Sequence, residues 1–344
     1  MNHVLIVGGG MAGCTIAKEL SENGVFVTIV EAADEIGGKV RGYGCKATEV
    51  CNNCGVCLAA GLWKKIDTNK NIEILSRTRL IDLTGKKGCF KAAVKNDDGI
   101  KYIENLSNVV VSTGFKPGSL KNFNSFVELD GIKKIMTGSD LERLFKERTS
   151  DKLFGKPPSS IAFIQCYGSR DSKEKAMYCS RVCCSYSTRA SKVIRSMYPE
   201  CEIAFYYMEL QMVNEGNYFQ ELKDLGVEFI KCRPVHIDGD KGIVEYDDPD
   251  TGKREARRFD IVVLSDGIHP TADADMIAEI CGLCQDETGF LKYTTGLSET
   301  KDSGIFVAGC AGGPKKIEDT YAESASIVRE ILFGQVGHEY IDRR

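Results

Sequence analysis

The sequence has 344 residues, of which 42% are hydrophobic and 27% are charged, and its formal net charge is −4. That length predicts about two domains, each large enough to enclose its own hydrophobic core. The weak negative charge argues against nucleic acid as a partner, and without an apolar run of about 18 residues no membrane-spanning helix is expected.

Cysteine is unusually frequent, with 15 residues against four histidines. The N-terminus has no basic stretch before its apolar segment, so we expect a strand there rather than a signal peptide, and a cytoplasmic location. In such a reducing compartment, clustered cysteines more often bind metal or serve redox chemistry than form structural disulfides. The scarcity of histidine argues against a histidine-based active site.

The chain begins with the pattern of a βαβ unit. An apolar strand over residues 4–7 leads into a glycine-rich run, a helix follows over residues 15–22, and a second strand over residues 25–30 ends at Glu31. A carboxylate at this place can accept hydrogen bonds from both ribose hydroxyls of a dinucleotide and would repel a 2′-phosphate.

The glycine run has the dinucleotide-binding spacing Gly8-x-Gly10-x-x-Gly13. Gly8 permits a tight turn, Gly10 lets the backbone approach a pyrophosphate, and Gly13 lets the helix pack closely on the sheet. The N-terminus of the helix adds free N–H groups and a partial positive charge. We therefore predict a bound dinucleotide.

The next segment, residues 37–61, is rich in glycine and cysteine and is expected to be irregular up to about residue 58. It holds a first cysteine group, Cys45, Cys51, Cys54 and Cys57, whose CxxCxxC run resembles ferredoxin cluster loops. Four thiolates could hold a 4Fe–4S cluster. A redox disulfide, a zinc site or plain buried thiols are the alternatives.

Strand-like and helical segments then alternate to the end of the chain, with Lys116-Pro117-Gly118 as the predicted crossing into another domain. The expected strands cover residues 72–75, 90–94, 109–111, 161–164, 202–207, 261–264 and 305–309, and the expected helices cover residues 186–197, 218–225 and 319–333. This order predicts an α/β protein with two Rossmann-like domains. The first comprises residues 1–115 and 262–344, and the second, residues 116–261, interrupts it.

Two features favour FAD over NAD in the first domain. The run Ile36-Gly37-Gly38 resembles the second glycine motif of flavoproteins with two dinucleotide-binding domains, and residues 304–309 resemble the late strand that closes their flavin site. An ordinary core strand is the alternative for the latter. Residues 165–170, after the first strand of the second domain, contain no such glycine motif, which argues against a standard NAD(P)H site.

A second cysteine group consists of Cys166, Cys179, Cys183 and Cys184. Adjacent cysteines are poor disulfide partners, whereas their thiolates can bind one cluster. The nearby arginines Arg170, Arg181 and Arg189 would offset the charge of a thiolate-bound cluster, unless they are ordinary surface residues. We expect structural thiols at Cys281 and Cys284, and buried thiols at Cys14, Cys89, Cys201 and Cys232.

Three longer motifs, residues 164–171, 178–184 and 309–319, resemble the A subunits of heterodisulfide reductases, which contain flavin and iron–sulfur clusters. The similarity extends over essentially the whole chain. In that family a cysteine at the position of Cys310 is normal, although most related flavoproteins have Asp there.

The resemblance implies FAD at a set of positions around the glycine motifs: Gly8, Gly10, Met11, Ala12, Gly13, Glu31, Gly37, Gly38, Thr113, Gly114, Gly309, Cys310, Gly313, Pro314, Lys315 and Ile317. It implies a 4Fe–4S cluster at the second cysteine group, and the first group is a candidate for another. Lys315 could tune the flavin, the alternative being a surface lysine.

Electron-bifurcating members of this family are much longer and carry added ferredoxin domains, so the compact length looks most like the short form found in complexes of sulfur oxidisers. The resemblance thus implies an electron-transfer subunit that serves sulfane or disulfide oxidation or related disulfide redox metabolism. It also implies other subunits as partners and a homodimer as the chain's own assembly. The alternatives are a quinone-interacting or bifurcating relative, an NAD(P)H-dependent disulfide reductase using Cys51 and Cys54, and a scaffold with vestigial FAD.

Overall fold

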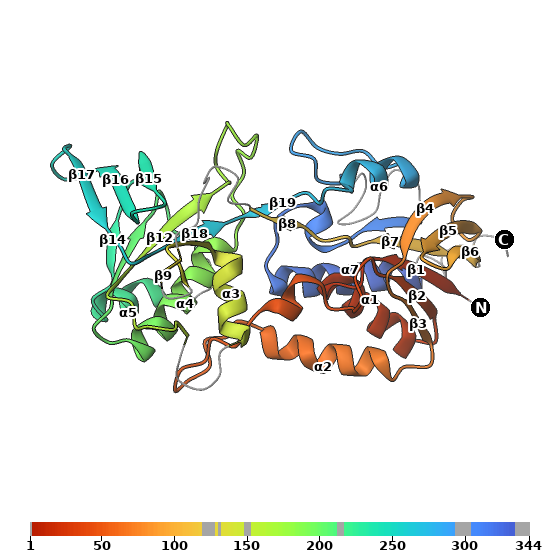
Figure 1. Ribbon diagram of the computed structural model, residues 1–344. Helices are drawn as coiled ribbons and strands as arrows, with labels where there is room; N and C mark the ends of the chain where they lie inside the picture. Colours follow the sequence, from red (N-terminus) through yellow and green to blue (C-terminus); the bar gives the residue numbers. More distant parts are fainter. Residues whose placement is uncertain are drawn as a thin grey trace. The chain divides into compact units, whose positions relative to one another are not determined.

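The computed structural model divides into two units (Figure 1). Unit 1 comprises Met1–Arg41, Gly55–Lys116 and His269–Arg344, and unit 2 comprises Gly42–Cys54 and Pro117–Ile268. The structure describes residues 2–118, 128–129, 132–147, 153–211, 217–292 and 304–333. No helix within these ranges is long and apolar enough to cross a membrane.

Unit 1 is built on a parallel five-stranded sheet of order β20-β7-β1-β2-β3. Its strands are β1 (His3–Val7), β2 (Phe26–Val30), β3 (Ile72–Leu75), β7 (Asn108–Val111) and β20 (Ile305–Val307). The apolar run at residues 4–7 is almost inaccessible to solvent, as expected for a parallel strand that is covered on both faces.

Helices and an antiparallel meander surround this sheet (Figure 1). The helices of unit 1 are α1 (Met11–Glu22), α2 (Val56–Asp67), α6 (Ala274–Cys281) and α7 (Ile317–Phe333), with the short 3₁₀ helices η1 (Gly38–Gly42) and η2 (Gly309–Gly312). The meander consists of β4 (Arg79–Thr84), β5 (Phe90–Asn96) and β6 (Gly99–Leu106). Its apolar side chains and those of α6 form one core with Leu5, Val109 and Ile305 of the sheet.

Unit 2 repeats the same plan with a parallel sheet of order β11-β18-β12-β13-β14 and a meander. The sheet contains β11 (Ile135–Thr137), β12 (Ser160–Tyr167), β13 (Glu202–Tyr206), β14 (Glu228–Ile230) and β18 (Ile261–Asp266), and the meander contains β15 (His236–Asp238), β16 (Ile243–Asp247) and β17 (Arg254–Arg258). The helices are α3 (Gly138–Glu147), α4 (Cys183–Met197) and α5 (Tyr218–Asp224). Unit 2 also contains the short strands β9 (Glu128–Leu129) and β10 (Ile132–Lys133), whereas β8 (Lys116–Pro117) and β19 (Ile268–His269) each have one residue in either unit.

The central strand of unit 2 shows why its sequence is apolar throughout. Ile161 and Phe163 belong to a core with the helices, whereas Ala162 and Ile164 belong to a second core with the meander. Because side chains alternate along a strand, a strand between two cores needs apolar residues at every position.

The structure corrects the expected boundaries at two places. The strand at residue 261 was expected to open the return of the first domain at residue 262, but β18 pairs with β11 and β12 and therefore belongs to unit 2. Residues Gly42–Cys54 also belong to unit 2 rather than to the first domain. A buried ion pair, between Lys46 Nζ and Glu142 Oε2 at 2.5 Å, holds this segment to α3.

Candidate functional site

Two of the three glycines in the first motif have no room for a side chain, and the third borders open space. Gly8 has a φ of +104°, and a Cβ there would lie 2.4 Å from the carbonyl oxygen of Ser112. A Cβ on Gly13 would lie 2.1 Å from the carbonyl oxygen of Gly8. At Gly10 a Cβ would meet no heavy atom within 4 Å, so the chain leaves open space there, and α1 begins without a side-chain cap. This open, uncapped helix start is suited to a phosphate group.

Glu31 lies at the end of β2 and is bonded to the glycine loop. Its Oε2 accepts a hydrogen bond from the N–H of Gly9, and its Oε1 accepts one from the N–H of Ala33, both at 2.8 Å. The carboxylate is therefore held beside the first motif, where the ribose of a dinucleotide was expected. Its contact with ribose stays a prediction.

The second glycine motif packs directly on the first. The N–H of Gly37 donates to the carbonyl oxygen of Gly9 at 2.7 Å, and a Cβ on Gly38 would lie 3.1 Å from the Cα of Gly10. Trp63, from α2, also borders this motif, because a Cβ on Gly37 would lie 2.9 Å from its ring. Trp63 was not predicted to be near the site, although it is the only tryptophan in the chain.

The late motif reaches the same edge of the sheet. Strands β1, β7 and β20 are parallel neighbours, so Gly8, Thr113 and Gly309 follow three adjacent carboxyl ends, where ligands of such sheets bind. Gly309 has a φ of +63°, and a Cβ on it would lie 2.9 Å from the Cβ of Ala12 in α1. Gly114 and Gly313 also have positive φ, Pro314 precedes α7, and Ile317 is the first residue of that helix.

Lys315 is largely buried, so the alternative of an ordinary surface lysine was wrong. Its side chain is 13% exposed, and Nζ donates to the carbonyl oxygen of Gly309 at 3.0 Å and lies 3.4 Å from Oε1 of Glu323. Glu323 Oε2 accepts the N–H of Gly309 at 2.6 Å. Burial raises the pKa of the neighbouring Cys310 thiol. Glu323 was not predicted from the sequence. The one local indication is that it follows Asp319 by one helical turn, near the acidic first turn of α7.

The second cysteine group comes together in unit 2 where a strand meets a helix. Cys166 lies near the end of β12 with a φ of +60°, and Cys183 and Cys184 are the first two residues of α4. These three are buried, and Cys179 is partly exposed. The N–H of Arg181 donates to the Sγ of Cys179 at 3.3 Å. Thiolates at a helix N-terminus are stabilised by the helix dipole.

Hydrogen bonds and nearby charges lower the thiol pKa of two members of this group, Cys166 and Cys184. A hydrogen bond from Cys183, together with Arg170 and Arg233, lowers the pKa of Cys166 to about 7 against the opposing effect of burial. The bond that Cys183 shares with Cys184 lowers the pKa of the Cys184 thiol, whereas the pKa of Cys183 itself is raised well above its ordinary value by the same two bonds and by burial. Burial also raises the pKa of Cys179.

Two arginines act near Cys166. Arg170 lowers the pKa of the Cys166 thiol and also lies 3.2 Å from a carboxylate oxygen of Glu209, and its expected role in offsetting the charge of a cluster stays a prediction. Arg233 holds that loop, since Nη1 donates to the carbonyl oxygen of Arg170 at 3.1 Å. Arg233 was not predicted, because it lies far along the chain from every cysteine motif.

Arg189 instead binds the segment that carries the first cysteine group. It donates to the carbonyl oxygens of Asn52 at 2.8 Å and Asn53 at 3.3 Å. In this segment Cys45 and Cys51 are exposed, and each accepts a backbone N–H from two residues ahead, at 3.5 and 3.4 Å. Cys54 completes the part of the group that belongs to unit 2, whereas Cys57 lies in α2 of unit 1.

All 15 cysteines lie in the described ranges and are free thiols. Cys14, Cys201 and Cys281 are buried and Cys284 is exposed. The expectation of burial was wrong for Cys89, which is exposed in the turn before β5, and for Cys232, which is partly exposed. Among the described residues, no three or more His, Cys, Asp or Glu side chains are arranged to hold a metal ion.

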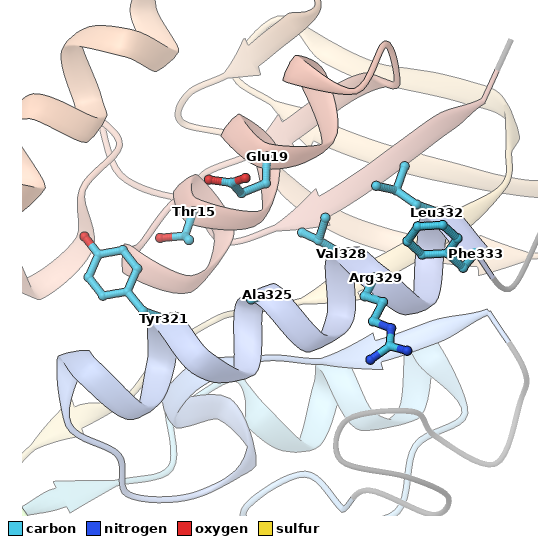
Figure 2. A pocket seen from close by; sticks show the side chains of 8 residues that line it. All are labelled: Thr15, Glu19, Tyr321, Ala325, Val328, Arg329, Leu332 and Phe333. Atoms are coloured by element: carbon cyan, nitrogen blue, oxygen red, sulfur yellow. The ribbon is translucent and has the colours of Figure 1, made fainter.

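A groove of about 540 Å³ lies between α1 and α7, away from the predicted cofactor residues. Figure 2 shows Thr15 and Glu19 of α1 facing Tyr321 and Val328 of α7 across it, with Phe333 at the end of α7. Its lining is mostly apolar and contains none of the residues that the sequence motifs single out.

Residues 6–73 match a family described as an NAD(P)-binding Rossmann-like domain. The chain is 26% identical to the A subunit of the ferredoxin:CoB-CoM heterodisulfide reductase of Methanosarcina mazei, over 96% of this chain and 53% of that protein. It is 30% identical to the A subunit of the H₂:CoB-CoM heterodisulfide,ferredoxin reductase of Methanothermobacter marburgensis, over 94% of this chain and 62% of that protein. The chain thus spans less than two thirds of the length of these relatives.

Solved structures share the fold. The thioredoxin reductase of T. acidophilum has a TM-score of 0.63 and 17% identity, covering 98% of this chain and all of that one. An NAD-dependent persulfide reductase from A. fulgidus has a TM-score of 0.58 and 17% identity, covering 96% of this chain and 59% of that one. The predicted fold class, with two Rossmann-like domains, is confirmed.

Proposed function

We propose that this chain is an FAD- and iron–sulfur-dependent oxidoreductase subunit that passes electrons within a heterodisulfide-reductase-like complex. Its homology to the A subunits of heterodisulfide reductases, over 93 to 96% of its length, supports this. The reaction it serves belongs to sulfane-sulfur or disulfide oxidation, or to related disulfide redox metabolism. One observation carries the proposal. In unit 2 the second cysteine group extends from the end of β12 to the first turn of α4, the strand-to-helix place where unit 1 has its glycine motif.

The residues of unit 1 fit FAD. Open space at Gly10 and the uncapped start of α1 suit the pyrophosphate, and we assign the ribose to Glu31, whose carboxylate is bonded to the glycine loop. The turn at Gly38 borders Gly10 in the glycine loop, and the loop from Gly309 to Lys315 borders Ala12 at the start of α1. When bound, FAD accepts or donates two electrons, together or singly. The chain's own part is to orient the cofactor, exclude water and fix the charges around it.

The residues of unit 2 fit a 4Fe–4S cluster. Four thiols are the donor set of such clusters. A cluster is larger than a single metal ion, so its cysteine ligands lie farther apart than the ligands of one ion. When bound, the cluster would transfer one electron at a time. Arg170 and Arg233 would balance the negative charge of the thiolates, and the first turn of α4 would direct N–H groups toward Cys183 and Cys184.

The first cysteine group is our candidate for a second cluster. Backbone N–H groups already point at the sulfurs of Cys45 and Cys51, as in cluster loops. The exposure of these sulfurs suits contact with a partner protein. The relatives are named as components of multi-subunit reductases, which supports other subunits as partners, and the free state of every cysteine supports the reducing cytoplasm. A homodimer is part of the same proposal.

The competing function, an NAD(P)H-dependent disulfide reductase that uses Cys51 and Cys54, needs a nucleotide site in unit 2. Cys166 and its loop take the place that the phosphates would need. NAD(P)H should therefore fail to reduce the flavin of the purified protein, whereas a low-potential ferredoxin-type donor should reduce it.

The deciding experiment is the ratio of iron and acid-labile sulfide to FAD in protein purified without oxygen. About four irons per FAD would mean one cluster, and about eight would mean that both groups are loaded. Cys183→Ser should remove about four irons, and Cys201→Ser, a buried cysteine of unit 2 outside the group, should remove none. Absence of iron after reconstitution would refute the proposal.

A further inference from the structure

We propose that Glu323 is a positioning residue that neutralises Lys315 and thereby keeps the reduction potential of the bound flavin low. This inference rests on the proposed function, since it requires FAD in unit 1. Lys315 and Glu323 are not ordinary surface charges, because their side chains are only 13% and 9% exposed.

The geometry is a closed arrangement around one glycine. Glu323 Oε2 accepts the N–H of Gly309 at 2.6 Å, and Lys315 Nζ donates to the carbonyl oxygen of the same residue at 3.0 Å. The two charged groups lie 3.4 Å apart. Both backbone groups of Gly309 are thus bound by one ion pair, which fixes the loop between β20 and α7.

This ion pair acts at the expected cofactor edge. Gly309 borders Ala12 in the first turn of α1, the turn whose start is open to a phosphate. Burial is the main cause that raises the pKa of the Cys310 thiol, and both charges act on it as well, since that of Lys315 lowers the pKa and that of Glu323 raises it. The loop therefore presents two opposed charges, not a single cation, to whatever lies beside Cys310.

Opposed charges have opposite effects on a flavin. Reduced FAD is anionic at neutral pH, so a nearby cation stabilises it and raises the potential, and an anion lowers it. A buried charge is screened less than an exposed one. Removing either charge of the pair should therefore change the electrostatic potential at a flavin several ångströms away. Glu323 in this arrangement cancels most of what Lys315 would otherwise do.

The test is an anaerobic spectroelectrochemical titration of the FAD in the complete protein. Glu323→Gln keeps the acceptor for Gly309 but removes the carboxylate charge beside Lys315, so the midpoint potential should rise. Lys315→Gln should lower it. We expect each shift to be about 30 mV, which is a tenfold change in a two-electron equilibrium. The double variant should return close to the wild-type potential.

Two controls separate charge from folding. Glu323→Asp, which keeps the charge, should retain the wild-type potential, and Glu330→Gln makes the same change at an exposed position of α7. Shifts of the same sign in both single variants, or no difference between Glu323→Gln and Glu330→Gln, would overturn the inference. A wild-type protein that binds no FAD would instead overturn the proposed function.

Discussion

Asp266, at the end of β18, should make the stability of the protein depend on pH. Its carboxylate accepts hydrogen bonds from the N–H and the hydroxyl of Ser139, at 3.0 and 2.7 Å, and the residue is only 4% exposed. Burial raises its pKa from 3.8 to about 6. A raised pKa means that the folded state prefers the protonated acid, so its stabilisation is complete below about pH 4 and is lost as pH rises through 6. A difference of about two units corresponds to roughly 3 kcal/mol.

The variant Asp266→Asn tests this reasoning, because Asn cannot ionise but still accepts a bond from Ser139. Urea denaturation at pH 4, 5, 6 and 7 would give the free energy of unfolding of each protein. The wild type should lose about 3 kcal/mol relative to Asp266→Asn between pH 4 and pH 7. Asp224→Asn changes an exposed residue of α5, and its free energy of unfolding should depend on pH in the same way as that of the wild type. A constant difference between wild type and Asp266→Asn at every pH would refute the argument.

Three further predictions concern the candidate sites. Gly10→Ala should fold normally but raise the dissociation constant of FAD about tenfold, whereas Gly13→Ala should destabilise the protein by about 1 to 3 kcal/mol, since only the Cβ on residue 13 clashes with backbone. Calorimetry would measure FAD binding and thermal melting would measure stability. Equal losses of stability in the two variants would contradict this prediction. The fluorescence of Trp63, the only tryptophan, should be quenched when FAD is added to the FAD-free protein, because its ring packs on Gly37 beside the first motif, and unchanged emission with FAD bound would place the cofactor elsewhere. Arg233→Gln should lower the midpoint potential of the cluster in an EPR-monitored titration, since it removes a positive charge that acts on Cys166, and an unchanged potential would show that Arg233 only holds the loop.

The residues of the candidate FAD site were predictable because their signals are local. The spacing of Gly8, Gly10 and Gly13 follows from a turn and a helix start that the same short segment builds. The structure shows backbone clashes for a Cβ on Gly8 or Gly13 and open space at Gly10. The second cysteine group was also visible, since two of its members are adjacent. The unit to which each strand belongs was harder to infer. Residues 109–111 and 261–264 are alike in composition, and only their pairing partners place them in different sheets.

Helix α2 and the residues that support the site were missed for a related reason. The helix begins inside a glycine- and cysteine-rich stretch, and its buried face, Ala59, Leu62 and Ile66, is short. Arg233 acts through a contact with Arg170, which is remote in sequence, and Glu323 acts from one face of α7 on Gly309. No local pattern encodes such contacts, because they depend on how the completed sheet and helices pack.

Within unit 2, helix α4 connects the second cysteine group to the part of the first group that lies in this unit. Its first turn carries Cys183 and Cys184, and Arg189, in its second turn, binds the backbone of the segment that carries Cys45, Cys51 and Cys54. Electron tunnelling slows exponentially with distance, so a relay between two centres needs a separation that thermal motion does not change. A single helix that holds both segments would act as the rigid spacer of such a relay, and it would keep that tunnelling distance constant while partner proteins bind and leave.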